Sequence, residues 1–275
     1  MILETHPFVV FLLSTFFYFF LTQTQNFIFC KSHHKNGNNF PRKKDLMFVL
    51  KIGGSTLFDD QGKIKKSLIS EYVKTIKNLF TKKKFRFTLV IGGGTTARKY
   101  IASLRKLGAT EAYSDIVGIE AAKLNARLII GCLGSLAYPH PPSSFQEFLG
   151  LYYSTEKIIV CGGFQPGQST NAVASIIAEA ISAKKLINIT DVAGVYSSDP
   201  DTNKDAKLLQ EVSVAEFKKM IAEQKTKAGH YPLFDMTAIQ IIERSNIKLQ
   251  FIDGTDITNL QKVLAGKSIG TLVTN

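Results

Sequence analysis

A short apolar run that stops at glycine occurs three times in this chain. β-branched and aromatic residues favour strands, and glycine permits a tight turn at the strand end. Each run is followed by a segment with apolar residues at three- and four-residue steps, which is typical of an amphipathic helix. Repeated units of strand, turn and helix predict an α/β protein. The three runs and their glycines are Phe48–Ile52 with Gly53-Gly54-Ser55, Phe85–Ile91 with Gly92-Gly93-Gly94, and Lys157–Cys161 with Gly162-Gly163.

The rest of the chain continues this alternation. It predicts a mostly parallel sheet with both faces covered, that is, a three-layer αβα sandwich. No repeat or linker divides the chain after Met47, so residues 47–275 are expected to form one domain. Expected helices span residues 64–80, 115–133, 172–181, 214–223 and 235–244, with one more that starts at Thr95 or Thr96 as cap; Asp235 is another expected N-cap. Further expected strands span residues 186–190, 248–252 and 269–273.

The first glycine turn combines features that suit phosphate binding. Glycine lets backbone N–H groups approach an anion, a following helix adds a positive dipole, and Lys51 supplies a full charge near the strand end. Ligands of parallel sheets bind at the carboxyl ends of the strands. We therefore expect the glycine turns to face one another at one edge of the sheet.

Two common nucleotide motifs do not explain these turns. Gly266-Lys267-Ser268 resembles the end of a Walker A motif but lacks its first glycine and follows no strand. Gly92-x-Gly94-x-x-Ala97 fits a dinucleotide fingerprint, with Asp115 placed to bind a ribose, but a single such unit leaves the other two turns unused. A phosphoryl-transfer site with two substrates uses all three.

Composition favours small anionic ligands. The chain has 34 Lys and Arg against 22 Asp and Glu, a net charge of +12. The densest basic run, residues 82–86, lies between an expected helix and strand, where a solvated loop is the simpler interpretation. We therefore expect no nucleic-acid partner. The three cysteines are far apart and the five histidines lack metal-ligand spacing, so we expect a reducing compartment and no metal ligands from the protein.

Residues 1–46 are expected to lie outside the domain. The apolar stretch Phe8–Leu21 is about two-thirds of the length of a membrane-spanning helix. It resembles a signal-peptide core, although no Lys or Arg precedes it. Two interpretations remain open: a targeting extension, or an over-extended start with translation from Met47. We expect a cytoplasmic protein with no stable membrane span after Met47, or an organellar or membrane-associated one if the extension is a genuine targeting segment.

Several ordered blocks together resemble the amino-acid kinase superfamily, and within it the archaeal-type uridylate (UMP) kinases. The resemblance covers about residues 47–275, and its specificity comes from the order and spacing of the blocks. They are L-K-I-G-G-S (50–55), V-I-G-G-G-T-T-A-R-K-Y (90–100), D-I-V-G-I-E-A-A-K-L-N-A-R-L-I-I (115–130), A-Y-P (137–139), G-G-F-Q-P-G-Q-S-T-N-A-V-A (162–174), T-D-V-A-G-V-Y-S-S-D-P (190–200) and I-D-G-T-D (252–256).

The resemblance implies an amino-acid kinase-like fold, transfer of phosphate from ATP to UMP, Mg²⁺ that accompanies ATP, and a homohexamer. Lys51 and Arg98 would be catalytic, because cationic groups must supply most of the stabilisation in phosphoryl transfer. ATP would contact Lys51, Ile52, Gly53, Gly54, Ser55, Gly94, Arg98, Thr190, Tyr196 and Asp199. UMP would contact Gly93, Asp115, Phe164, Gln165, Pro166, Gly167, Gln168, Ser169 and Thr170.

Some residues depart from the family pattern. The acceptor loop usually reads G-H-T-T-D-A, whereas residues 167–172 read G-Q-S-T-N-A, and Ala193 replaces a usual Asp. Two alternatives therefore stay open: a kinase of the same fold that acts on another small phosphate or carboxylate, such as isopentenyl phosphate, and a non-catalytic nucleotide or oxyanion binder. Isopentenyl phosphate kinases characteristically carry a His near the second glycine turn, and residues 94–97 contain none.

Overall fold

Seven strands form the central sheet of the computed structural model, which describes residues 46–82, 85–200, 202–224 and 234–275. The strand order is β3-β2-β1-β4-β6-β7-β5. The first five strands in this order run parallel, whereas β7 is antiparallel to β6, and β5 is parallel to β7. The strands are β1 (Leu46–Ile52), β2 (Phe85–Ile91), β3 (Ile159–Cys161), β4 (Lys185–Thr190), β5 (Glu211–Ser213), β6 (Leu249–Asp253) and β7 (Thr271–Thr274).

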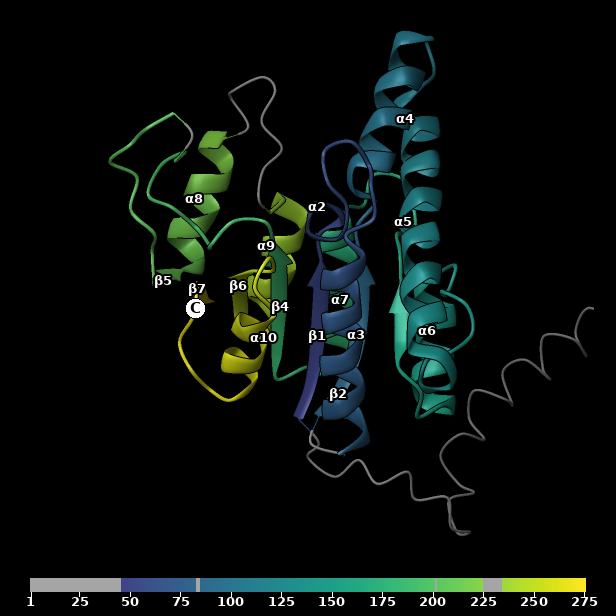
Figure 1. The fold of residues 1–275 in the computed structure, drawn as a ribbon. Helices are drawn as coiled ribbons and strands as arrows, with labels where there is room; N and C mark the ends of the chain where they lie inside the picture. The colour runs from purple at the N-terminus through teal and green to yellow at the C-terminus, as the bar shows by residue number, and fades with distance from the viewer. Residues whose placement is uncertain (1–45, 83–84, 201, 225–233) are drawn as a thin grey trace, which may run out of the picture. The chain divides into compact units, whose positions relative to one another are not determined.

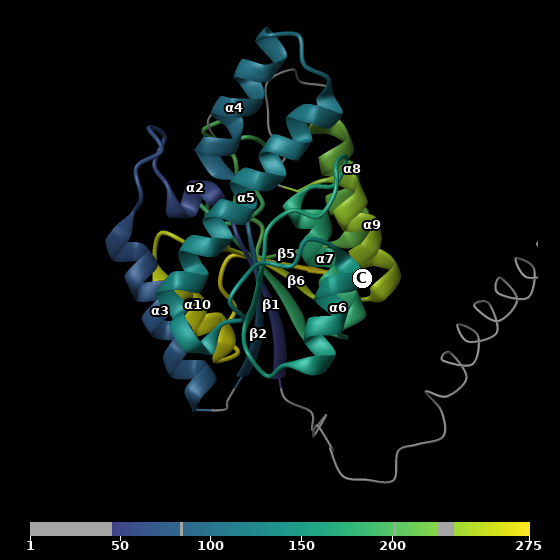
Figure 2. The ribbon, with the colours of Figure 1, turned by 90° about the vertical axis from the view of Figure 1, so that its right-hand side faces the viewer.

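Helices cover both faces of the sheet (Figures 1 and 2). Side chains alternate between the faces, so Leu50 packs towards α3, α5 and α10 while Val49 packs towards α7, α8 and α9. This is the predicted αβα sandwich. The helices are α2 (Gly54–Leu57), α3 (Lys66–Thr81), α4 (Gly94–Lys106), α5 (Glu111–Leu133), α6 (Phe145–Ser154), α7 (Thr170–Ala180), α8 (Val214–Gln224), α9 (Met236–Ser245) and α10 (Ile257–Leu264).

The helices and strands expected from the sequence are present, with ends that differ by a few residues. Three α-helices and one strand were not predicted, namely α2, α6, α10 and β5, nor was the short 3-10 helix Gly134–Leu136. Asp235 caps α9 as predicted, because its carboxylate accepts the Ala238 N–H. The predicted threonine cap of α4 is wrong: Gly93 is the N-cap, and the hydroxyl of Thr95 instead donates to the Asp59 carbonyl.

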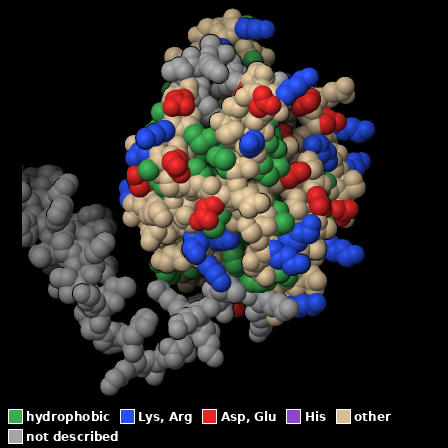
Figure 3. Space-filling model, turned by 90° about the vertical axis from the view of Figure 1, so that its left-hand side faces the viewer, with side chains coloured by type: hydrophobic (Ala, Val, Ile, Leu, Met, Phe, Trp, Pro, Cys, Tyr) green, Lys and Arg blue, Asp and Glu red, His purple; other side chains and the backbone are tan. Residues whose placement is uncertain are grey.

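The described residues from Leu46 onwards form one compact unit. The interpretations of residues 1–46 concern a segment that, apart from Leu46, lies outside the described residues. Among the helices that are described, none is both long and apolar enough to cross a bilayer. Figure 3 shows the face nearest β5 and α8, where acidic and basic side chains are interspersed; that face therefore carries no continuous basic surface.

Candidate active site

The carboxyl ends of β1, β2, β3 and β4 open into one cleft of about 900 Å³. Gly53, Gly93 and Gly163, one from each glycine turn, all line it. The turns therefore face one another, as the sequence predicts. A volume near the upper end of the usual range for small-molecule sites leaves room for a ligand larger than a single small metabolite.

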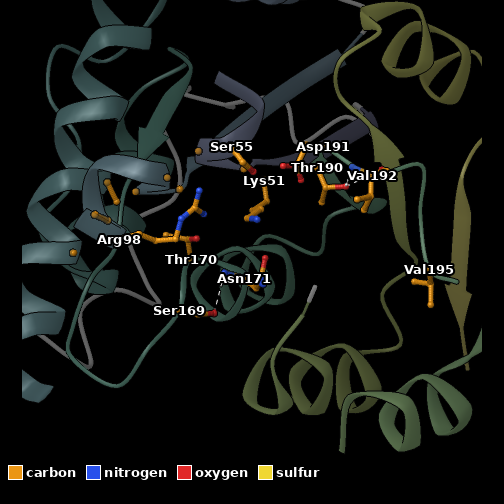
Figure 4. Close-up of a pocket in the computed structure, with 18 of the residues that line it drawn as sticks. Lys51, Ser55, Arg98, Ser169, Thr170, Asn171, Thr190, Asp191, Val192 and Val195 are labelled. Atoms are coloured by element: carbon orange, nitrogen blue, oxygen red, sulfur yellow. Dashed lines mark hydrogen bonds between the residues drawn. The ribbon is translucent and has the colours of Figure 1, made fainter. Parts of the chain in front are cut away.

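Lys51 projects from β1 into the middle of this cleft (Figure 4). Its side chain is 9% exposed. Burial lowers the pKa of the Lys51 ammonium from 10.5 to about 8, and the nearby carboxylates of Asp191 and Asp235 partly oppose this change. Lys51 is thus a largely desolvated cation, whose interaction with a bound anion is stronger than it would be in water.

The first two glycine turns pack directly against each other. A Cβ on Gly54 would lie 2.2 Å from the Cα of Gly94, so the backbones approach more closely than any side chain allows. The Gly53 N–H donates to the Ile189 carbonyl of β4 at 2.8 Å, so this amide is not available to a bound phosphate. The first amides of a helix have no intrahelical acceptor, which leaves those of Gly54 and Ser55 available for a phosphate.

Asn125 of α5 holds the second glycine turn in place. Its buried side-chain amide donates to the carbonyls of Gly92 at 2.9 Å and Gly93 at 3.1 Å. Arg98, in the second turn of α4, lines the cleft and donates to the Thr95 hydroxyl at 3.1 Å. The second turn therefore brings a permanent positive charge to the cleft on a fixed backbone.

The loop after β3 is tied to two helices. Asp115 of α5 accepts the Gly167 N–H at 2.8 Å. The hydroxyl of Ser169 caps α7 by accepting two amide hydrogens of its first turn, and it donates to the carboxylate of Asp235 at the start of α9. Gln168 and Thr170 line the cleft beside them. The positive end of the α7 dipole thus lies at the cleft, where an anion is favoured.

The opposite end of the cleft is formed by the segment after β4 and by α8. Thr190, the last residue of β4, is buried, and its hydroxyl donates to the Val192 carbonyl at 3.0 Å. A mixture of apolar walls and a few polar groups suits a nucleoside base. The residues that line this end include Val195, Tyr196, Asp199, Phe217 and Met220.

Most of the predicted contact residues line the cleft, but five do not. Ile52 is 1% exposed and points into the core on the α3 side. Phe164 packs against the core on the other side. Gln165, Pro166 and Gly167 are exposed, and none of the three lines the cleft. Those that line it are Lys51, Gly53, Gly54, Ser55, Gly93, Gly94, Arg98, Asp115, Gln168, Ser169, Thr170, Thr190, Tyr196 and Asp199.

Sequence reasoning missed several residues of the site. Asn125 is a polar residue on the buried side of α5, and that pattern could have marked it. Asp235 was predicted only as a helix cap. The positions of α8 side chains depend on how the chain folds back over the sheet, which no local pattern reveals. The missed residues that line the cleft include Ile101, Ile119, Asp191, Phe217 and Met220.

Fold and cleft together define an α/β protein whose glycine turns and cationic side chains suit a phosphorylated ligand, and comparison with known proteins gives its class. The amino acid kinase family model matches residues 47–253. The chain belongs to this family.

Similar proteins within the family include uridylate kinases of archaea. The chain is 44% identical to the uridylate kinase of Methanobrevibacter smithii over 228 residues, which cover 83% of this chain and 99% of the relative. It is 42% identical to that of Hyperthermus butylicus over 226 residues, covering 82% and 97%. The crystal structure of uridylate kinase from Archaeoglobus fulgidus superposes with a TM-score of 0.72 at 36% identity, over 82% of this chain and 99% of that one.

Proposed function

We propose that this protein is an ATP-dependent UMP kinase, which converts ATP and UMP to ADP and UDP. The observation that carries the proposal is the convergence of three glycine turns, Lys51 and Arg98 on one cleft. Uridylate kinases at 42–44% identity over nearly their whole length support the choice of UMP as acceptor.

The two ends of the cleft suit the two substrates. ATP would bind between the first glycine turn and the wall formed by Thr190, Tyr196 and α8, with its phosphates directed at Lys51. UMP would bind on the side of Asp115 and the start of α7, where ribose hydroxyls meet a carboxylate and the phosphate meets a helix N-terminus.

Transfer needs electrostatic stabilisation more than covalent chemistry. The acceptor is a phosphate oxygen that is already ionised, so it needs no general base. Lys51 and Arg98 would neutralise charge on the phosphoryl group as it passes in line between the substrates. The two cations differ in exposure. Lys51 is buried and held by β1, whereas the Arg98 side chain is exposed and can move with the phosphoryl group during transfer.

We propose that magnesium enters with ATP. In the described residues no three His, Cys, Asp or Glu side chains lie close enough together to hold a metal. This fits an ion that is bound mainly by phosphate oxygens and water, which is how Mg²⁺ usually binds nucleotides. The chain contributes through the amides of Gly54 and Ser55, which would fix the phosphates that carry the ion.

A panel of acceptors tests the proposal. The full chain with Mg·ATP would be incubated in parallel with UMP, CMP, AMP, isopentenyl phosphate and small carboxylates, and product formation followed by chromatography. UDP formation with a kcat/KM at least about tenfold above every other acceptor is expected. Preference for a different acceptor, or ATP binding without transfer to any, would contradict it.

We also propose a homo-oligomer, a hexamer by family resemblance, that acts in the cytoplasm in pyrimidine nucleotide biosynthesis. Several large apolar side chains on α4, at its C-cap and on α5 are exposed, and a subunit contact would cover such residues. Both cysteines in the described residues are free, which suits a reducing compartment. Light scattering on the eluting native protein tests the assembly: a mass of one subunit would contradict it. The exposed side chains are Tyr100, Leu107, Tyr113, Ile116 and Leu124.

A further inference from the structure

The middle of β4 carries one polar side chain in an otherwise apolar strand. A strand with parallel neighbours on both sides and helices on both faces is expected to be apolar throughout, and Leu186, Ile187 and Ile189 follow this rule. Asn188 breaks it. Its side chain is 0% exposed, and neither its amide oxygen nor its amide nitrogen has a hydrogen-bond partner within the described residues. An unpaired buried amide is unfavourable, so packing alone does not account for it.

Asn188 lies directly beside Lys51. The register of β1 and β4 pairs these two residues, and paired residues on neighbouring strands direct their side chains to the same face of the sheet. That face is the one covered by α7, because Val49 and Leu186, two positions earlier on each strand, belong to the core cluster on that side. Lys51 reaches the cleft, whereas Asn188 is fully enclosed. Asn188 therefore does not line the cleft itself; its side chain lies in the core layer beside that of Lys51.

Helix α7, which covers this face of the sheet, carries a second buried polar group. Ser175 is 0% exposed, and its hydroxyl has no hydrogen-bond partner within the part of the chain that is described. Asn171, one helical turn earlier, lines the cleft. Helix α7 contacts both β1 and β4. Lys51 and Asn188 are thus polar side chains on a face of the sheet whose other core residues are apolar, and α7, which covers that face, contains the buried hydroxyl of Ser175.

We infer that Asn188 is a positioning residue for Lys51: the dipole of its side-chain amide, which makes no hydrogen bond to any described residue, favours the charged form of the neighbouring lysine and keeps the ammonium group directed at the transferring phosphoryl group. This inference rests on the proposed kinase function. A neutral amide suits the task better than a carboxylate would. It stabilises the ammonium without forming an ion pair, which would compete with the phosphates for Lys51.

Other charged groups also act on Lys51. Asp191 at the end of β4 and Asp235 at the start of α9 are close enough to raise its pKa. Substitution of Asn188 leaves all of these groups in place, so variants that differ only at this position report on the amide. The remaining charged residues of the cleft are Arg98 of α4, Asp115 of α5, Asp199 of the loop after β4 and Glu223 of α8.

A pair of variants with the same shape tests the inference. Asn188→Val and Asn188→Thr both suit a strand, and they differ only in a hydroxyl that can accept a hydrogen bond. Ile187→Val, the adjacent residue on the opposite face, is the control for general loosening of β4. For each full-length variant we would measure the denaturation midpoint, kcat and KM from pH 6 to 10, and the Lys51 titration by NMR with ¹³C-labelled lysine.

Asn188→Val is expected to unfold at a midpoint no lower than that of the natural protein, since it removes an unpaired amide, yet to lose about tenfold in kcat. Its Lys51 is expected to titrate about half a pH unit lower or more. Asn188→Thr should retain most activity, and Ile187→Val should keep the natural pH profile. Equal behaviour of the Val and Thr variants, whether both active or both impaired, would overturn the inference. Absence of UDP formation by the natural protein would instead refute the kinase proposal, and the Lys51 titration would still decide the role of Asn188.

Discussion

Replacement of Lys51 by methionine is expected to abolish activity and to make the protein more stable. The lysine ammonium is buried, and its pKa falls from 10.5 to about 8. At about 1.4 kcal/mol per pH unit, this difference means that the charged form costs the ligand-free fold about 3 kcal/mol. Methionine fills a similar volume without a charge, so the variant should recover most of that free energy near pH 7.

Urea or guanidinium denaturation from pH 7 to 10.5 measures this effect. Above pH about 8 the folded protein releases the Lys51 proton while the unfolded chain still holds it, so the stability of the natural protein rises with pH through this window. The advantage of Lys51→Met should therefore shrink as the pH approaches 10.5. Lys99→Met, at an exposed position on α4, is the control and should change stability by less than about 0.5 kcal/mol. A Lys51→Met variant that is no more stable than the natural protein at pH 7 would refute the reasoning.

Three further predictions concern the site. Gly94→Ala should weaken ATP binding and lower the free energy of unfolding by about 2 kcal/mol or more, because the added methyl group would lie 2.9 Å from the Gly54 backbone. Gly108→Ala is the control: Gly108 also has a positive φ, but nothing lies within 4 Å of an added Cβ. This variant should lose only about 1 kcal/mol of unfolding free energy, measured by denaturation, from backbone strain. Asp115→Ala, which frees the Gly167 amide, should raise the KM for UMP about tenfold and leave the KM for ATP unchanged, whereas a parallel rise in both would contradict its placement. In steady-state kinetics, kcat/KM for ATP should fall as pH rises through about 8, and an alkaline limb that begins only above pH 10 would show that Lys51 is not desolvated in the free enzyme.

Local patterns predicted the strands and turns that build the cleft. The glycine turns could be placed because a parallel sheet puts the carboxyl ends of its strands at one edge. The close contact of Gly54 and Gly94 explains why both positions lack a side chain. The place of Lys51 in the cleft could be predicted from its position one residue before the end of β1.

The missed elements had weaker or overlooked signals. Ser144 is the N-cap of α6, and its hydroxyl accepts the Glu147 N–H. The Glu147 carboxylate in turn accepts the Ser143 N–H. This pattern is close to a capping box and could have been recognised in the sequence. Strand β5 has three residues, too few for any periodicity. Helix α8 follows β5, and β5 pairs with β7, the strand that runs antiparallel to β6. The contribution of α8 to the cleft therefore depends on the order and direction of strands in the assembled sheet.

Errors at single residues have local physical causes. Thr95 was expected to cap α4, but the preceding glycines already form the N-terminal turn, and its hydroxyl bonds to the Asp59 carbonyl in another loop. The expected UMP contacts of residues 165–167 stay a prediction: these residues are exposed and do not line the cleft, but the Gly167 N–H donates to Asp115, which does line it. No sequence pattern marked Asn188, because the role inferred for it depends on its pairing with Lys51 on the neighbouring strand.

The central claim is that one cleft holds two phosphorylated nucleotides end to end across Lys51. A bisubstrate analogue with adenosine and uridine joined through a chain of phosphates tests it directly by isothermal titration calorimetry. The account predicts one analogue bound per subunit, more tightly than ATP or UMP alone, with binding suppressed by an excess of either nucleotide and weakened in Lys51→Met. Binding that only one of the two nucleotides suppresses would contradict the account.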